Sequence, residues 1–122
     1  MPHLAAELSE SFESWTSQVR KGFLELCVLN ALAGEERYGY DLVKALVAAP
    51  GVGVTEGTLY PLLSRLRLQG LIEARLVESA EGPARKYYRL TQAGRTMVGL
   101  MNRYCDDMLT GLRSLRTWGD QS

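Results

Sequence analysis

The sequence predicts a mainly α-helical fold that carries one small β-hairpin. Apolar residues recur at three- and four-residue spacing over most of the 122 residues, which is the period of an amphipathic helix. The exception is the stretch 71–90, where two runs of strand-forming residues flank the turn sequence SAEGP at 79–83. A chain of this length has room for one domain and a modest core.

The first expected helix covers residues 4–19. Its apolar side chains form a single stripe made of Leu4, Leu8, Phe12, Trp15 and Val19. Because the remainder of the chain is small, a partner subunit is the natural cover for this stripe. We therefore expect Trp15 to be buried in a dimer interface, although an aromatic ring of this size can also stack on a flat ligand.

Two further helices are expected before residue 50. Residues 20–33 are apolar on more than one face, which predicts the central core helix, and Gly34 can end it. Residues 39–48 form a short helix, and the Pro- and Gly-containing segment 48–54 is a turn. Cys27 and Cys105 fall inside helical patterns and are interpreted as small apolar residues rather than as a disulfide, and one histidine with two distant cysteines does not make a zinc site.

Residues 55–72 predict a helix that buries one face and exposes the other. Four leucines at helical spacing point inward, namely Leu59, Leu62, Leu63 and Leu66. The Thr55 hydroxyl can cap the start and Gly70 can end the helix in a left-handed turn. The outer front is small or polar and consists of Glu56, Gly57, Thr58, Tyr60 and Ser64. Such a front can approach a surface closely, and a helix N-terminus attracts phosphates.

The last third predicts a hairpin and a long helix. Residues 71–78 and 85–90 are the expected strands, and Thr91 is the expected cap of a helix that reaches about Leu115. The apolar positions of that helix are wide enough for self-association and are Met97, Leu100, Met101, Tyr104, Met108, Leu112 and Leu115. This order of elements predicts a winged helix-turn-helix at 20–91, preceded by an amphipathic helix at 1–19 and followed by a dimerisation helix at 92–122.

Composition limits the function classes. The formal net charge is zero, which argues mildly against nucleic acid, but residues 51–91 contain six basic and four acidic residues. DNA binding through a local patch is therefore expected to depend strongly on salt. We find neither a nucleophile–base set nor a phosphate loop, so we expect no enzyme, metal or cofactor. The absence of a signal peptide pattern or of an apolar run near 20 residues favours a cytoplasmic protein without a membrane partner.

Four separated blocks resemble the PadR family of bacterial transcriptional regulators. They are GFLELCVLNALA at 22–33, YGY at 38–40, TEGTLYPLLSRLRLQGLI at 55–72 and RKYYRLTQAG at 85–94. Their order and spacing match over about residues 20–95, and the single helix after the hairpin is similar to the smaller subgroup. The resemblance implies a homodimeric winged-helix repressor that binds a pseudo-palindromic double-stranded DNA operator and is often released by a small-molecule effector, whose identity the sequence does not give.

The helical patterns and the resemblance together predict which residues lie at each interface. The DNA-binding set is Tyr40, Thr55, Glu56, Gly57, Thr58, Tyr60, Ser64, Arg65, Arg85 and Lys86. The dimer set is Leu8, Phe12, Trp15, Met97, Met101, Tyr104, Met108 and Leu112. Alternatives stay open for some of these residues: Tyr60 could instead cover the edge of the core, Arg65 could form a salt bridge, and Arg85 with Lys86 could be an ordinary solvated turn. The helix front lacks Arg, Asn and Gln, the usual bidentate base readers, so shape readout by the wing is expected to contribute. The alternative function is a winged-helix module that binds proteins and not DNA.

Overall fold

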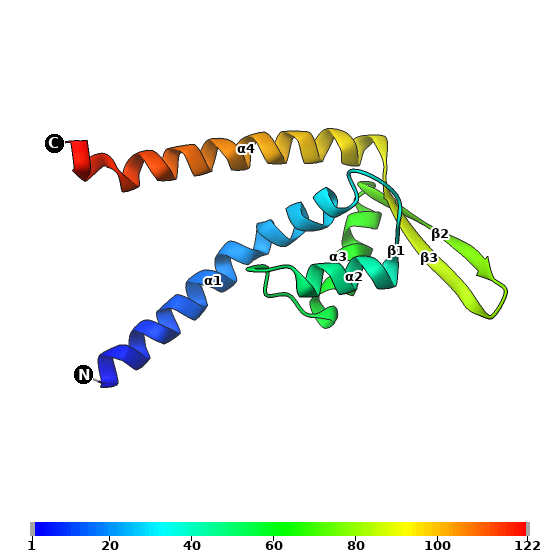
Figure 1. Cartoon of the computed structure of the whole chain (residues 1–122), viewed down its shortest axis with the longest axis horizontal. Coiled ribbons are helices and arrows are strands. Elements are labelled where there is room, and N and C mark those ends of the chain that lie inside the picture. The colour runs from blue at the N-terminus through cyan, green and yellow to red at the C-terminus, as the bar shows by residue number, and fades with distance from the viewer. Residues whose placement is uncertain (1, 122) are drawn as a thin grey trace.

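The computed structural model describes residues 2–121 and has four α-helices and a three-stranded sheet among them (Figure 1). The helices are α1 (Pro2–Ala31), α2 (Gly39–Ala48), α3 (Glu56–Leu68) and α4 (Gln92–Arg116), followed by the short 3-10 helix η1 (Trp118–Gln121). The strands are β1 (Arg37–Tyr38), β2 (Ile72–Ser79) and β3 (Gly82–Leu90). The C-terminal half of α1 packs with α2, α3 and the sheet into one head, which confirms the predicted fold class.

Helix α1 is one continuous helix of 30 residues, so the prediction of separate helices at 4–19 and 20–33 is wrong. The expected boundary between residues 19 and 20 falls inside it. No proline interrupts this region, and the single Gly22 costs an exposed helix only about 1 kcal/mol. The halves differ in burial rather than in secondary structure: Val28 and Leu29 are fully buried, whereas Phe12 and Trp15 are exposed.

The core forms where the apolar faces of α1, α2 and α3 meet. It contains Leu24, Val28, Leu29 and Leu32 of α1, Leu42, Val43 and Leu46 of α2, Leu59, Leu62, Leu63 and Leu66 of α3, and Ile72, Tyr88, Leu90 and Val98 from the sheet and α4. The inward face of α3 is thus confirmed. Gly70 ends the α3 turn with a φ of +77°, also as predicted. Thr55 precedes α3, but its hydroxyl lies 3.3 Å from the Thr58 hydroxyl and makes no capping bond to the backbone, so the predicted cap is wrong.

The sheet is antiparallel in the order β1-β3-β2. Strands β2 and β3 form the expected hairpin, but pairing extends to Ser79 and Gly82, so the turn is shorter than the predicted 79–83. Strand β1 was not predicted, because two residues cannot display an alternating pattern. It pairs Arg37 with Tyr88 and Tyr38 with Tyr87, which joins the start of α2 to the wing.

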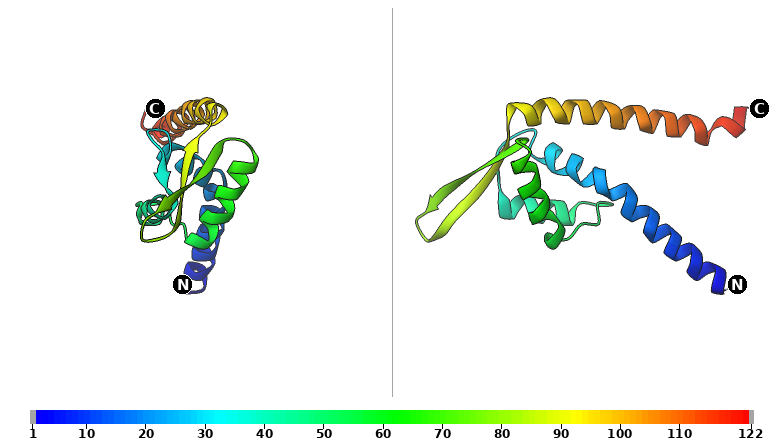
Figure 2. Two further views of the ribbon diagram at one scale, coloured as in Figure 1. Left: turned by 90° about the vertical axis from the view of Figure 1, so that its right-hand side faces the viewer. Right: turned by 180° about the vertical axis from the view of Figure 1, so that it is seen from behind.

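Helix α4 begins at the predicted cap, where the Thr91 hydroxyl accepts a hydrogen bond of 3.0 Å from the Gly94 N–H. From there α4 and the N-terminal half of α1 leave the head on the same side and diverge (Figure 2). Near the head the two helices are joined by the side-chain amides of Asn30 and Asn102, which exchange two hydrogen bonds of 2.9 Å. Within residues 2–121, the structure has no helix that is both long and apolar enough to span a membrane.

Candidate nucleic-acid interface

The exposed front of α3 matches the predicted surface. Thr55, Glu56, Gly57, Thr58, Tyr60 and Ser64 are all exposed. Tyr60 has 46% of its surface accessible, so part of the side chain is open to a partner. The front combines hydroxyl groups with an open position at Gly57, where an added Cβ would meet only the Thr55 hydroxyl, at 3.9 Å. This arrangement suits contact with a phosphate backbone or groove floor.

Arg65 points from α3 toward α1. Its guanidinium forms an ion pair with the carboxylate of Glu25, so the salt bridge that was one of its two sequence interpretations is present. A phosphate would have to compete with this carboxylate for Arg65 or use its remaining donors. The role of Arg65 in DNA binding therefore stays a prediction. The sequence alone does not identify Glu25 as the partner of Arg65, because the two residues are 40 positions apart.

The two wing residues predicted to bind DNA, Arg85 and Lys86, lie on opposite faces of the hairpin. The Arg85 guanidinium is 5.1 Å from the centre of the Tyr38 ring, and the Lys86 ammonium is 5.7 Å from that of Tyr88. Successive side chains of a strand point to opposite faces, so Arg85 lies on the face that carries Tyr38 and Lys86 on the face that carries Tyr88. Lys86 faces the α3 side, where burial raises the pKa of Tyr88 and the nearby Arg67 charge partly opposes that increase.

Tyr40 lies in the first turn of α2, beside the wing. Its ring is 6.1 Å from that of Tyr38, and 55% of its surface is exposed. Lys44 sits one turn later with its ammonium 5.5 Å from the Tyr40 ring centre. Lys44 is not among the residues predicted from the sequence, although its position four residues after Tyr40 places both on one helix face.

Gly39 allows this part of α2 to reach the wing. A Cβ at residue 39 would lie 2.9 Å from the Tyr88 ring and 3.3 Å from the Lys86 carbonyl oxygen. Any larger residue would push the start of α2 away from β3. The glycine of the Tyr-Gly-Tyr motif therefore determines how closely the start of α2 approaches the wing.

Ion pairing separates the cations of the head into two groups. Arg75 donates to both oxygens of Glu36, at 2.8 and 2.5 Å, and this lowers the pKa of Glu36 and raises that of Arg75. Arg89 donates to Glu73 at 2.5 Å. Among residues 2–121, the cations that lack a carboxylate partner within 4.0 Å include Lys44, Arg67, Arg85 and Lys86. Cations without such a partner thus occur on α2, α3 and the wing, and others lie on α1 and α4, although the whole chain is neutral.

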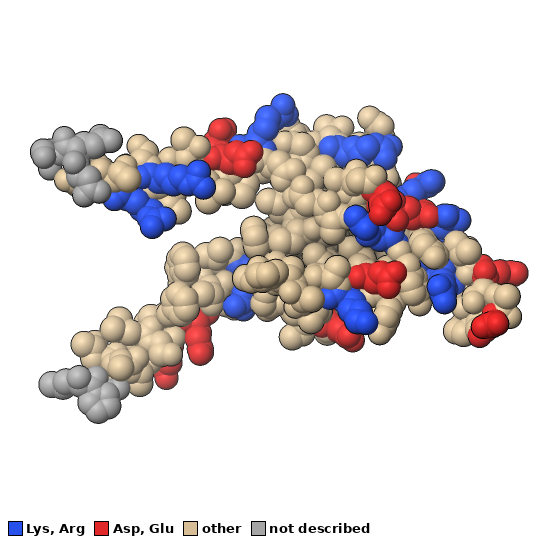
Figure 3. Space-filling view, viewed as in Figure 1, with Lys and Arg blue, Asp and Glu red and all other residues tan. Residues whose placement is uncertain are grey.

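A second surface lies between the diverging helices. Apolar side chains of α1 and α4 line an open groove of about 850 Å³, namely Val19, Phe23, Leu26, Leu100, Met101, Tyr104, Met108, Leu109 and Leu112. Beyond it Leu8, Phe12 and Trp15 are 59–63% exposed, and the facing sides of the helices carry little charge near the head (Figure 3). The predicted dimer residues therefore share one apolar surface, with Met97 at its margin (39% exposed).

The two cysteines lie on the facing helices α1 and α4. Cys27 and Cys105 are half-buried free thiols, and burial together with the neighbouring Cys105 raises the pKa of Cys27. Over the described part of the chain, His, Cys, Asp and Glu do not gather in any group of three or more that could hold a metal ion.

Comparison with known proteins identifies close relatives. Residues 28–99 match the profile of the transcriptional regulator PadR-like family. "Transcriptional regulator Rv3488" of Mycobacterium tuberculosis is 39% identical over 83 residues, which cover 66% of this chain and 74% of that protein. A PadR family regulator from Eggerthella lenta superposes with a TM-score of 0.76 at 31% identity, over 90% of this chain and 96% of its own. Bacillus subtilis PadR, solved with operator DNA, superposes with a TM-score of 0.54 at 26% identity, over 62% of this chain and 44% of its own.

Proposed function

The chain belongs to the PadR-like family of transcriptional regulators, and from this premise we propose that it is a repressor that binds a pseudo-palindromic operator as a homodimer. The observation that carries the proposal is the exposed, hydroxyl-bearing front of α3, together with a wing whose Lys86 faces the α3 side and has no carboxylate partner in the described part of the chain. The solved complex of Bacillus subtilis PadR with operator DNA supports it. The proposed function places the chain with the chromosome, in the cytoplasm.

The homodimer is proposed from the apolar surface on α1 and α4. A stripe that includes Phe12 and Trp15 at about 60% exposure is costly to leave in water, at roughly 25 cal/mol per Å² of apolar area. A second copy offers the same surface, and two-fold symmetry would place two α3 helices to read two half-sites about one DNA turn, ~34 Å, apart. A small-molecule effector that binds within the same apolar groove would act by favouring dimers with a different spacing.

DNA binding is tested by fluorescence anisotropy with a labelled duplex from the region upstream of the chain's own gene. We expect binding that weakens steeply as salt rises, because phosphate contacts release counterions. Tyr60→Ala combined with Lys86→Ala should reduce the affinity at least tenfold. Arg89→Gln is the matched control, because Arg89 is a wing arginine already paired with Glu73. Unchanged binding in the double variant would contradict the proposed interface, and no binding at any salt concentration would favour the protein-interaction alternative.

The dimer is tested by sedimentation velocity. Phe12→Ser with Trp15→Ser should convert a dimer into a monomer, because each change removes a large apolar contact. Glu10→Ser is a control on the opposite side of the same helix. A monomeric wild type, or a double variant that remains dimeric, would contradict this part of the proposal.

A further inference from the structure

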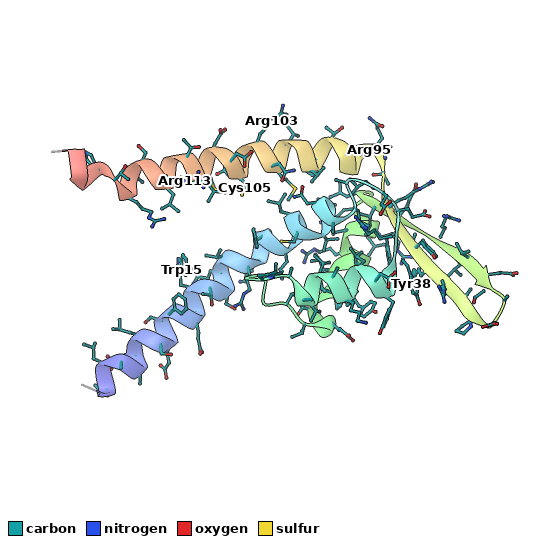
Figure 4. The ribbon with its side chains drawn as sticks, viewed as in Figure 1. Trp15, Tyr38, Arg95, Arg103, Cys105 and Arg113 are labelled. Carbon is teal, nitrogen blue, oxygen red and sulfur yellow. The ribbon has the colours of Figure 1, made fainter. Side chains whose placement is uncertain are left out.

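Three tyrosine rings form a row between α2 and the wing, which we call the tyrosine ladder (Tyr40, Tyr38 and Tyr87). The ring centres are 6.1 Å apart from Tyr40 to Tyr38 and 5.6 Å apart from Tyr38 to Tyr87. The interplanar angles of 36° and 34° make these tilted, offset contacts, which aromatic pairs favour. Tyr38 lies in the middle, so it is the ring that joins the helix to the hairpin (Figure 4).

Backbone pairing fixes the place of Tyr38. Strand β1 puts Tyr38 opposite Tyr87 of β3, and α2 begins at the next residue, Gly39. Tyr38 is half-buried at this junction, whereas Tyr40 is exposed. Its backbone is therefore held by the sheet, while its ring remains available to side chains of the wing.

Cations lie over every ring of the ladder. Lys44 is 5.5 Å from the Tyr40 ring centre, Arg85 is 5.1 Å from that of Tyr38, and Arg75 is 5.7 Å from that of Tyr87. The electron-rich face of an aromatic ring attracts a cation at this range and restricts where it goes. Arg75 is neutralised by Glu36, whereas Lys44 and Arg85 have no carboxylate within 4.0 Å among residues 2–121. The ladder thus holds two cations without such a carboxylate partner, from different elements, over neighbouring rings whose centres are 6.1 Å apart.

We propose that Tyr38 is a positioning residue that holds the Arg85 guanidinium toward α2, so that Arg85 and Lys44 bind the phosphates of one DNA strand as a unit. The inference rests on the proposed DNA binding and adds two residues, Tyr38 and Lys44, to it. The long arginine side chain at the hairpin would otherwise sample many rotamers, and each would have to be ordered on binding. A ring that pre-orders it lowers this cost without touching the DNA.

The test measures how the DNA affinity depends on salt, because each phosphate contact contributes about 0.9 to the slope of log K against log salt concentration. Arg85→Gln and Lys44→Gln should each reduce the slope by about 0.9. Tyr38→Leu should reproduce most of the loss seen in Arg85→Gln, although it removes no charge. Tyr38→Phe keeps the ring and should keep the wild-type slope.

A double-mutant cycle separates positioning from a general structural role. In the Arg85→Gln background, Tyr38→Leu should cause no further change in slope, because the side chain on which it acts is gone. Thermal unfolding of each variant checks that the head is folded, and Arg89→Gln should leave the slope unchanged. If Tyr38→Leu retains the wild-type slope, or lowers it further in the Arg85→Gln background, the inference is overturned. A wild type that binds no DNA would instead refute the proposed function.

Discussion

Gly94 is the position where a single added methyl group should most disturb the joint between α4 and the sheet. A Cβ on residue 94 would lie 2.0 Å from the Leu71 carbonyl oxygen and 3.3 Å from Cδ2 of Leu90. Either α4 or the backbone at Leu71 must move by about 1 Å to open the first contact to 3.0 Å. That oxygen is also held in place, because it accepts a hydrogen bond of 3.1 Å from the Thr91 N–H.

The cost follows from what this movement breaks. Loss of the Thr91–Leu71 hydrogen bond costs about 1–3 kcal/mol, and overpacking adds about 1–3 kcal/mol. The better helix propensity of alanine returns about 1 kcal/mol. We therefore expect Gly94→Ala to lower the free energy of unfolding by about 3 kcal/mol.

Urea denaturation at a fixed protein concentration measures this change, since a dimer would make stability depend on concentration. Gly99→Ala is the control: it lies in the same helix, is exposed, and its added Cβ would meet nothing within 4 Å. It should stabilise the chain by up to about 1 kcal/mol. If both variants unfold at the same urea concentration, the close approach of α4 to Leu71 does not exist.

Two further predictions use the same head. Gly39→Ala should lower the free energy of unfolding by about 1–2 kcal/mol in the same assay. The loss should be smaller than for Gly94→Ala, because the nearest obstacle to the added Cβ, at 2.9 Å, is the Tyr88 side chain rather than backbone. A variant as stable as wild type would contradict this. In a Cys105→Ser variant, the rate at which iodoacetamide modifies Cys27 should rise at a higher pH in the folded protein than in the urea-unfolded chain. The reason is that burial, the larger cause of the raised Cys27 pKa, disfavours the thiolate. Coinciding profiles would show that Cys27 is solvated.

The parts of the fold that the sequence predicted are those encoded by local periodicity. Helix α2 has the expected bounds of 39 and 48, and the inward leucines of α3 are buried because their spacing leaves no other common face. The Thr91 cap formed, whereas the Thr55 cap did not. Both threonines have extended backbone, so the difference arises from where the hydroxyl points, which a sequence does not specify.

The parts that the sequence did not predict depend on partners far away along the chain. The Arg65–Glu25 pair spans 40 positions and the Arg75–Glu36 pair spans 39. Each removes an arginine from the count of free cations, so the local charge balance of residues 51–91 does not identify which cations remain free. The separation of Arg85 from Lys86 follows from strand alternation, but only once the pairing of β3 on both sides is known.

The continuity of α1 connects the proposed interfaces. At 1.5 Å per residue, 30 residues span about 45 Å, with one half inside the core and the other carrying the exposed apolar stripe. Two separate helices would leave a joint between the stripe and the head. One unbroken helix does not, so a partner that packs against Phe12 and Trp15 would also fix the direction of the core helix. The spacing of two α3 helices in the proposed dimer would then be set by how α1 packs on its partner. A small apolar effector bound at that contact would therefore change the α3 spacing, and with it the DNA affinity, more than one bound elsewhere.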